Sequence, residues 1–529
     1  MTVRQLLLVL HAVCMAGLCA PFALGYTYSD RLAARPSMYL IPVADQVAVP
    51  VRRPRRVYVV VMDGLGYTEA QGLRAAQRLR ERGQCWKTDV GPLPISRPVY
   101  GVLSTGVEQD RGGALSNDAL VPHAAMSIWE TARAAGLTVA AISELRWWQD
   151  LFPRGFSSYL TPPRAADYFR LAPAADLVLI HTLYIDETGH LSGADSAAYR
   201  QEVARADREL LPFLDTLDLS RDLIVLTADH GHSLGGGHGG TQDRVAQVLS
   251  CFAGAGVAHR TETGALRMTS LGPALALLMG LHFPTAMRAG DDDLDALWQL
   301  VDPAAFSAAY LQDRHQAVAR FRQANQQALF RFAPSSRGSW RAFYDAARTK
   351  RTRRGLLLLG LLGPLAVLHF LGHRRLRSPR RGGFRFGLLW IAGCAALAYV
   401  LQVELRGSFD MSSVNNRPGF IRFTLLLGLG ITGPWLGAHF LLRRSLPALL
   451  WDLSVLSLGG TLLCVLHPVV FGWHLGFPVP SPEAYFFPYF GALFLGALNG
   501  VALLLCLFGW AGQGRLKLSG VLDRTGQDA

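Results

Sequence analysis

Cysteine is scarce in this chain of 529 residues, which has seven cysteines and no CxxC pair. This excludes a metal site built from clustered thiolates. Five of the cysteines lie in apolar segments towards the two ends, at Cys14, Cys19, Cys394, Cys464 and Cys506. Only Cys85 and Cys251 fall in the polar part of the chain. They could form one disulfide if that part lies outside the cytoplasm.

The long central part of the chain also lacks an excess of either charge. Residues 26–347 carry 32 Lys and Arg against 33 Asp and Glu, whereas the rest carries 20 against 6. The net charge of +13 therefore belongs to the hydrophobic C-terminal part, where basic residues flank membrane spans. We exclude nucleic acid as a partner on this ground.

The N-terminal segment has the pattern of an export signal. Residues 1–25 begin with Arg4, continue as an apolar run from Leu6, and close with small residues at Ala23 and Gly25. Such a segment is either cleaved or kept as an anchor. A folded domain is then expected over residues 26–300, outside the cytoplasm, with a helical connector over residues 301–354.

Short apolar runs alternate with helical segments in the folded domain. The expected strands span residues 57–62, 137–142, 176–181 and 222–226, and the expected helices span about 69–83, 125–136, 197–217 and 268–281. This alternation predicts an α/β fold with a mostly parallel sheet sandwiched between helices. The acidic run Asp291–Asp293 is interpreted as a helix start or a solvated turn.

A membrane domain of about five transmembrane helices is expected over residues 355–510. The apolar runs, each near the 20 or so residues that cross a bilayer, lie at 355–371, 386–403, 421–442, 448–471 and 486–510. The loop 373–385 is rich in arginine, and the tail 511–529 is also basic. By the positive-inside rule both are cytoplasmic, which places residues 26–350 on the outer face.

The stretch from Thr227 to Gly240 carries the chemistry of the folded domain. Asp229 and His230 follow an expected strand, and His238 lies in a glycine-rich loop. Ligands of open α/β sheets bind beyond the carboxyl ends of the strands. One carboxylate and two imidazoles at that edge suit a divalent transition metal, most simply zinc.

Further polar residues follow the ends of other expected strands or lie in nearby loops. They are Asp63, Ser96, Asp186 and His190. In a parallel sheet these residues gather at one edge. Without cations, Asp63, Asp186 and Asp229 would repel one another there, so metal ions explain the pattern better than a satisfied polar core.

With these motifs the chain resembles the alkaline phosphatase superfamily over about residues 55–285. The shared motifs run in order as strand-Asp-Gly, a Ser/Thr loop, Asp-x-x-Gly-His, Asp-His-Gly and Gly-x-His-Gly. The resemblance implies two metal ions, the first held by three residues: Asp186, His190 and His238. The second is held by four: Asp63, Asp229, His230 and Ser96, of which Ser96 is also the nucleophile. His232 is interpreted as structural or peripheral.

The nucleophile loop narrows the choice within this superfamily. Ser96-Arg97-Pro98 is similar to the loop of glycosylphosphatidylinositol ethanolamine phosphate transferases and, more loosely, of nucleotide pyrophosphatase/phosphodiesterases. Arg97 could neutralise a phosphate oxygen. Sulfatases that mature to formylglycine need an arginine where this chain has Tyr100. A sulfatase is therefore the weaker alternative.

The expected function is that of a membrane-bound enzyme with an outward-facing active site. It would transfer or hydrolyse a phospho-headgroup, such as phosphoethanolamine, through a covalent phospho-serine. Five spans exceed what anchoring needs, which favours a membrane lipid or a lipid-linked phosphate as the substrate. The alternatives are a phosphodiesterase or phosphatase for soluble esters, and a membrane scaffold with an inactive domain.

Overall fold

The structure is a computed structural model. It describes residues 5, 6 and 8–17, scattered positions between residues 349 and 504, and most of residues 54–332, where the gaps are 113, 115–116, 118–121, 164–166, 241, 262, 285–286 and 288–290. The five expected membrane spans lie almost entirely outside the described residues. Among those that are described, no helix combines the length and the hydropathy that a bilayer span requires.

An eight-stranded sheet forms the centre of the domain, with the strand order β4-β3-β5-β1-β6-β7-β2-β8. The strands are β1 Val57–Met62, β2 Gly83–Asp89, β3 Val139–Ile142, β4 Ser158–Leu160, β5 Leu177–Thr182, β6 Leu223–Thr227, β7 Gln247–Gly254 and β8 Ala265–Arg267. Only β7 pairs antiparallel, with β6 on one side and β2 on the other. The sheet is therefore mostly parallel, as predicted.

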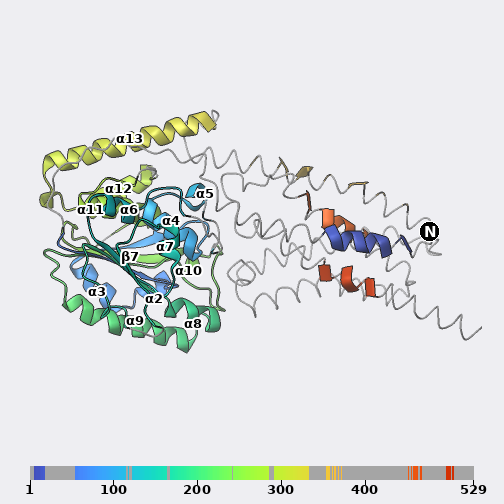
Figure 1. The fold of residues 1–529 in the computed structure, drawn as a ribbon, viewed down its shortest axis with the longest axis horizontal. Helices are drawn as coiled ribbons and strands as arrows, with labels where there is room; N and C mark the ends of the chain where they lie inside the picture. Colours follow the sequence, from blue (N-terminus) through green and yellow to red (C-terminus); the bar gives the residue numbers. More distant parts are fainter. Residues whose placement is uncertain are drawn as a thin grey trace, which may run out of the picture.

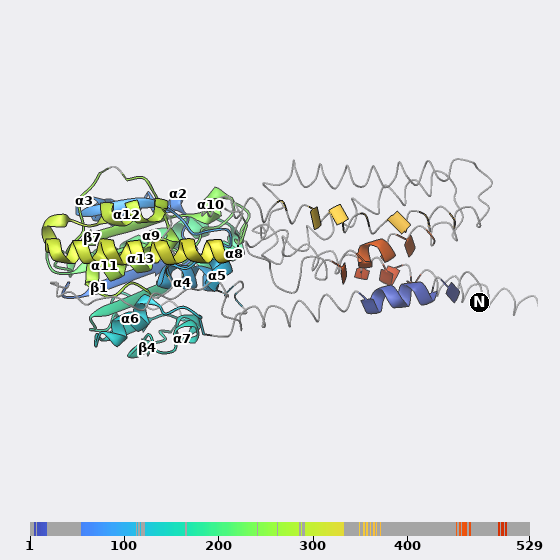
Figure 2. The ribbon, with the colours of Figure 1, turned by 90° about the horizontal axis from the view of Figure 1, so that it is seen from above.

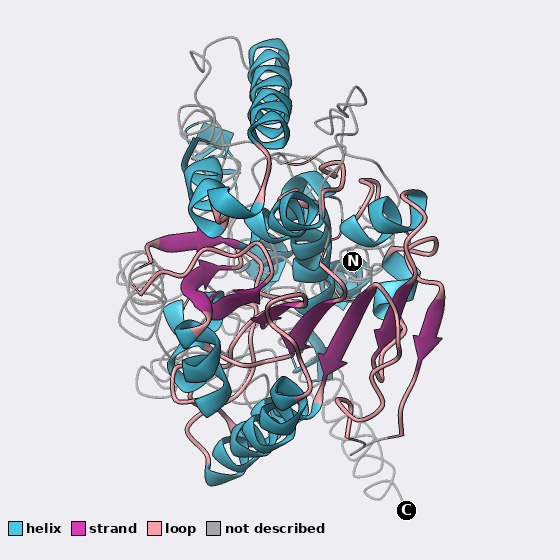
Figure 3. Ribbon diagram, turned by 90° about the vertical axis from the view of Figure 1, so that its left-hand side faces the viewer, coloured by secondary structure: helices cyan, strands magenta, loops and turns pink. Residues whose placement is uncertain are grey.

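Helices cover both faces of this sheet (Figures 1 and 3). One layer contains α2 Tyr67–Ala70, α3 Arg74–Glu81, α8 Tyr184–Ser192 and α9 Ala197–Asp215. The other contains α4 Ser96–Thr105, α6 Ile128–Ala134, α7 Trp147–Leu151, α11 Leu271–Met279 and α12 Asp291–Leu300. The short helices α5 Gln109–Gly112 and α10 Asp243–Ala246 lie at one end of the domain, and α13 Ala308–Phe332 runs across its outside (Figure 2).

The central strands form because their sequences are apolar throughout. Every residue of β1, with the sequence VYVVVM, is buried, as expected of a parallel strand covered on both faces. Its neighbours β5 and β6 are buried in the same way. The four strands expected from the sequence are thus confirmed, with shifts of up to two residues at their ends.

The sequence prediction was wrong in two places. It missed β2, β4, β7 and β8. Strands β4 and β8 have only three residues each, and β2 mixes polar and apolar residues. The mainly apolar sequence of β7 does not by itself distinguish a strand from a helix. The helix expected over residues 69–83 is divided into α2 and α3, and Gly83 already begins β2. Asp291 does begin helix α12, as one of the two interpretations of that acidic run had it.

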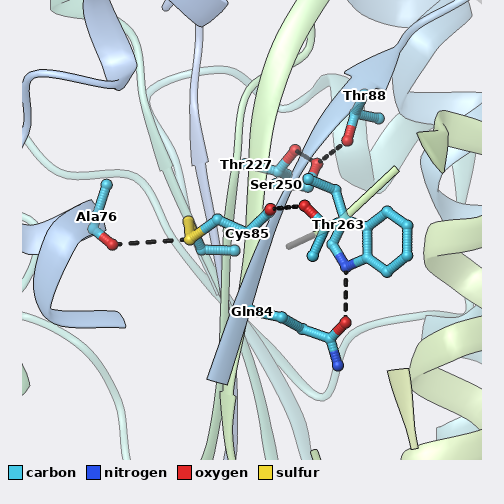
Figure 4. The surroundings of a disulfide bond; sticks show 9 residues. Ala76, Gln84, Cys85, Thr88, Thr227, Ser250 and Thr263 are labelled. Carbon is cyan, nitrogen blue, oxygen red and sulfur yellow. Dashed lines mark hydrogen bonds between the residues drawn. A yellow bond between two sulfur atoms is a disulfide. The ribbon is translucent and has the colours of Figure 1, made fainter. Parts of the chain in front are cut away.

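A disulfide joins Cys85 of β2 to Cys251 of β7 (Figure 4). The two residues lie directly opposite each other in the antiparallel register, with their Cα atoms 4.0 Å apart. The bond spans 166 residues of sequence and is buried beside the side chains that connect the strands, such as Ser250, which hydrogen-bonds Thr88 and Thr227. The disulfide that the sequence left open is therefore present.

A cluster of three polar side chains lies outside the α/β domain. Residues 8–17 are helical, and the His11 side chain is fully buried there. His11 Nδ1 lies 2.8 Å from Asn499 Oδ1, and His11 Nε2 lies 3.0 Å from Ser454 Oγ. Three segments far apart in sequence therefore meet at one imidazole.

We predict that replacing Cys85 and Cys251 together by alanine lowers the free energy of unfolding by about 2–4 kcal/mol, because the unfolded chain regains the freedom of a long loop. Thermal unfolding of the full chain in detergent measures this. Reductant should lower the midpoint of the wild-type chain towards that of the double variant. An equal effect of reductant on both proteins would contradict the prediction.

Candidate active site

The carboxyl ends of three adjacent parallel strands bring the predicted residues to one edge of the sheet. β1 lies between β5 and β6 and is parallel to both. Asp63 directly follows β1, and Asp229 and His230 follow β6. Asp186 and His190 lie on α8, which begins two residues after β5. Helices α5, α8 and α10 gather at the same end of the domain (Figures 1 and 2).

The first group of side chains consists of Asp63, Asp229 and His230, all fully buried. His230 Nε2 lies 3.4 Å from Asp63 Oδ1 and 3.3 Å from Asp229 Oδ2. Ser96, the first residue of α4, places its Oγ 3.2 Å from the same nitrogen. The structure thus brings together the four residues predicted for the second metal, including Ser96, which is also the predicted nucleophile.

The second group is centred on Asp186. His190 Nε2 lies 3.6 Å from Asp186 Oδ2, and His238 Nε2 lies 3.8 Å from Asp186 Oδ1. The two imidazole nitrogens are 3.1 Å apart. Asp186, His190 and His238, predicted as ligands of the first metal, are therefore neighbours, and the two groups adjoin through His230, whose Nε2 is 3.9 Å from Asp186 Oδ1.

Backbone carbonyls fix which nitrogen of two histidines faces the carboxylates. His230 Nδ1 lies 3.2 Å from the Gly231 carbonyl oxygen, and His238 Nδ1 lies 3.0 Å from that of Pro94. A carbonyl oxygen only accepts, so each Nδ1 carries the hydrogen. In the neutral imidazoles, each Nε2 then offers a lone pair, which is the arrangement of a metal-bound histidine.

The residues fit a cation. Among the described residues, no donor reaches Asp63 Oδ1 or Asp229 Oδ2, although both oxygens are buried. Each of these acceptors instead faces the lone pair of His230 Nε2. Oxygen and nitrogen acceptors that converge in the absence of a hydrogen are stabilised by a cation among them. The buried His/Asp clusters are therefore consistent with a metal site, and carboxylate and imidazole donors suit zinc.

The pKa values of the site residues are shifted by burial and by the nearby charges. Burial raises the pKa of Asp63 and of Asp229 well above the usual range, and a neighbouring aspartate raises each further. Burial also acts to raise the pKa of Asp186, but the hydrogen bond from His232 and the adjacent imidazoles outweigh it, so this pKa is lowered. Burial lowers the pKa of His238 to about 3.

Glycine permits the close approach of these elements. Gly64, after Asp63, has φ of +77°, and a Cβ there would lie 2.7 Å from the Asp186 Cα atom. A Cβ on Gly189 would lie 2.3 Å from the His232 ring. A side chain at position 64 would therefore push the Asp63 segment away from α8. A side chain at position 189 would push α8 away from the segment that carries His232.

Arg97, which follows the predicted nucleophile, contacts helix α7. Its guanidinium Nη2 lies 3.1 Å from Asp150 Oδ2, and its Cζ lies 4.9 Å from the centre of the Trp147 ring. The side chain is buried, so it is not a surface arginine. Asp150 and Trp147, which the guanidinium contacts, both belong to α7.

Sequence reasoning missed three residues of the site. His232 was interpreted as structural or peripheral, and its contact with the site, with Nε2 2.9 Å from Asp186 Oδ1, was not predicted. Tyr100 and His181 were given no role, yet both hydrogen-bond Asp63 Oδ2. His181 lies inside a buried strand, where only its polarity within an apolar run signalled a partner. Tyr100 lies four residues after Ser96 on α4, so the helical spacing could have placed it on the same face.

Comparison with known proteins agrees with this geometry. Residues 99–280 match the family model of type I phosphodiesterase / nucleotide pyrophosphatase. One curated relative is the catalytic subunit of GPI ethanolamine phosphate transferase 3 of Mus musculus, 23% identical over 279 residues, which cover 48% of this chain and 25% of that protein. Another is GPI ethanolamine phosphate transferase 3 of Schizosaccharomyces pombe, 32% identical over 119 residues, which cover 21% and 12%. The chain thus spans about a quarter or less of these relatives.

Solved structures were compared as well. Murine ectonucleotide pyrophosphatase/phosphodiesterase 5 is 13% identical with a TM-score of 0.38, and the match covers 47% of this chain and all of that chain. A mutant of the alkaline phosphatase PafA is 11% identical with a TM-score of 0.36, over 46% of this chain and 98% of that chain.

The α/β domain is thus similar over residues 99–280 to type I phosphodiesterases, and its buried His/Asp clusters are consistent with a metal site. The GPI ethanolamine phosphate transferases are distant homologues of part of the chain.

The raised pKa values of Asp63 and Asp229 predict how the metal-free protein responds to pH. A folded-state pKa above the unfolded value of about 4 means that the folded protein holds the proton more tightly. The contribution of each carboxyl to stability is therefore present at low pH and is lost as pH rises through the raised pKa. The variant Asp229→Asn keeps the acceptor for the Gly64 and His230 amides and removes the charge.

We expect Asp229→Asn to unfold at higher temperature than the wild type in chelator at pH 8, by a difference worth about 1 kcal/mol or more that shrinks towards pH 4. The lowered histidine pKa values largely cancel in this comparison. Added zinc should raise the midpoint of the wild type more than that of the variant. Asp195→Asn, at an exposed carboxylate, is the control. A difference that does not vary with pH would contradict the prediction.

Proposed function

We propose that the chain is a membrane-bound, outward-facing, two-metal enzyme that cleaves phosphodiesters and transfers or hydrolyses a phospho-headgroup through a covalent phospho-Ser96. The observation that carries the proposal is the convergence of buried carboxylate oxygens and imidazole lone pairs beside the Ser96 hydroxyl. A phosphodiesterase family match over residues 99–280, which include Asp186, His190, Asp229, His230 and His238 but neither Asp63 nor Ser96, supports it.

Two metal ions, most simply zinc, would be held by the two groups of side chains. Three residues would hold the first: Asp186, His190 and His238. Four would hold the second: Asp63, Asp229, His230 and the nucleophile Ser96. When bound, such ions stabilise the alkoxide of the attacking serine and the charge on the phosphoryl and leaving oxygens.

The chain's own residues would then carry the reaction in two steps. A bond forms between Ser96 Oγ and phosphorus, the bond from phosphorus to the leaving alcohol breaks, the serine proton passes to solvent and the alcohol takes up a proton. Water or an acceptor alcohol next attacks the phospho-serine and releases Ser96. The position of Ser96 at the first turn of α4 adds the partial positive charge of the helix N-terminus for the phosphate.

A lipid-linked phosphate is the substrate that we propose. The distant homologues are named as transferases of ethanolamine phosphate to GPI, and five membrane spans are expected after the folded domain. The disulfide between Cys85 and Cys251 supports a location outside the cytoplasm, because disulfides persist in oxidising compartments. We assign the first 25 residues to an anchor, residues 26–300 to the catalytic domain, residues 301–354 to a helical connector, and residues 355–510 to the membrane domain, with the tail 511–529 in the cytoplasm.

Replacing Ser96 separates an enzyme from a scaffold. We predict that Ser96→Ala lowers turnover roughly a thousandfold or more while zinc content stays near that of the wild type, because Ser96 contributes one of several ligands. The control is Ser104→Ala, at another buried serine of α4. The measurement is activity on a diester and a monoester with the same leaving group, with metal content by mass spectrometry. Unchanged turnover in Ser96→Ala would refute the proposed mechanism.

The fate of the headgroup distinguishes a transferase from a hydrolase. Membranes that contain the full chain are incubated with phosphatidylethanolamine labelled in its headgroup. Label that reaches a second lipid or glycolipid indicates transfer, and label that appears only in free phosphoethanolamine indicates hydrolysis. Activity confined to soluble esters would favour the alternative of a soluble-ester phosphodiesterase.

We also propose that the N-terminal segment is retained as an anchor. The support is the burial of His11 between Ser454 and Asn499, because removal of the segment would leave two buried polar side chains without this partner. An interhelical hydrogen bond of this kind in a membrane contributes about 0.6–1.7 kcal/mol.

We expect protein purified through a C-terminal tag to have a mass that includes residue 11. The variant His11→Leu should lower the thermal midpoint, whereas Val13→Ala, at an exposed position of the same helix, should not. A mature N-terminus beyond Gly25 would overturn the proposal.

A further inference from the structure

A chain of hydrogen bonds ends on the carboxylate of Asp63, on the side away from the proposed metal. Tyr100 Oη lies 2.5 Å from Asp63 Oδ2, and His181 Nε2 lies 3.0 Å from the same oxygen. Ser143 Oγ lies 2.7 Å from His181 Nδ1, and the Leu145 amide donates to that hydroxyl at 3.1 Å. The side chains of Tyr100, His181, Ser143 and Asp63 are all completely buried.

The direction of each hydrogen bond can be assigned from this sequence of contacts. Ser143 Oγ accepts the Leu145 amide, so its own hydrogen is available for His181 Nδ1. When Ser143 donates to Nδ1, His181 carries its hydrogen on Nε2. That hydrogen faces two acceptors, Asp63 Oδ2 at 3.0 Å and Tyr100 Oη at 2.9 Å from Nε2. Tyr100 donates to Asp63 Oδ2, so two donors occupy Oδ2 while Oδ1 accepts no hydrogen bond from the described residues.

Tyr100 is also tied to the nucleophile by the geometry of α4. Ser96 and Tyr100 are four residues apart on this helix, a spacing that puts both on one face. The Tyr100 ring stacks on Trp148, with centroids 4.0 Å apart and an angle of 15° between the planes. The Tyr100 hydroxyl thus has little freedom, and α4 carries both the hydroxyl that reacts and the hydroxyl that holds Asp63.

We propose that Tyr100 and His181 are positioning residues, which fix the Asp63 carboxylate so that only Oδ1 faces a metal ion. The ion would then be held next to the Ser96 hydroxyl. The inference rests on the proposed two-metal function. Neither residue touches the substrate, and both act through Asp63. Residues that orient a metal ligand in this way contribute about 10- to 100-fold to metal affinity.

The test is zinc binding to the full chain in detergent, by competition with a chromophoric chelator. Tyr100→Phe keeps the ring that stacks on Trp148 and removes the donor. We expect the affinity of one of two zinc sites to fall about tenfold or more and the other to stay unchanged. The absorption spectrum of the cobalt-substituted protein should change at one site, because Asp63 is no longer restricted to one oxygen.

Tyr310→Phe is the matched control. The Tyr310 hydroxyl is also buried and donates at 2.6 Å to the Leu277 carbonyl oxygen, outside the site. It should leave both the zinc affinity and the cobalt spectrum unchanged. Ser143→Ala, at the far end of the hydrogen-bond chain, should cause a smaller loss at the same zinc site, and it serves as the test if Tyr100→Phe does not fold.

The outcomes separate the two proposals. A wild-type chain that binds no zinc refutes the proposed function. A wild-type chain that binds two zinc ions, with Tyr100→Phe or Ser143→Ala binding them equally well, overturns only the positioning role. An equal loss in Tyr100→Phe and Tyr310→Phe also overturns it, because the effect would then come from the loss of any buried hydroxyl.

Discussion

The meeting of three carboxylates at one buried sheet edge is the constraint on which the site depends. Asp63, Asp186 and Asp229 come from separate parts of the chain, and all three lie where water does not compensate their charge. His230 and His238 add the lone pairs of their Nε2 atoms, which are further acceptors without a hydrogen. Such an arrangement destabilises the folded protein when no cation is bound, because the buried negative charges are not compensated. A bound cation stabilises it, because each acceptor atom then faces a positive charge. This destabilising arrangement lies at the end of the sheet where strands β1, β5 and β6 end.

The rest of the domain makes that place rigid. The apolar strands fix the positions of Asp63 and Asp229, and backbone carbonyls orient His230 and His238. Helix α4 carries both Ser96 and Tyr100, and Tyr100 hydrogen-bonds Asp63, so the helix fixes the position of Ser96 relative to Asp63. For the proposed function these side chains would form a preorganised set of metal ligands, so that little reorganisation would be needed when charge develops on a phosphoryl group. The disulfide lies in the other half of the sheet, between β2 and β7, where it joins two strands that are far apart in sequence.

Local sequence patterns were sufficient for much of this. Four strands could be predicted because runs such as VYVVVM are too apolar to lie anywhere but the interior. The sequence could propose Asp63, Asp186, His190, Asp229, His230 and His238 as one group because they lie beyond strand ends or in the adjacent glycine-rich loop, in motifs whose order resembles that of a known superfamily. The short outer strands β4 and β8 could not, because three residues carry no period, and β7 could not, because an apolar run alone suits a helix equally well.

By itself, the sequence determined the α/β class, the sheet edge that carries the chemistry and the identity of the six aspartates and histidines, because those depend on periodicity and on the order of local motifs. Only the tertiary structure decided that Cys85 pairs with Cys251, that Arg97 pairs with Asp150, and that Tyr100, His181 and His232 hold the aspartates. Each of these contacts joins segments whose separation in space depends on strand order and helix packing. No local pattern encodes that separation, since it arises from the burial of the whole core.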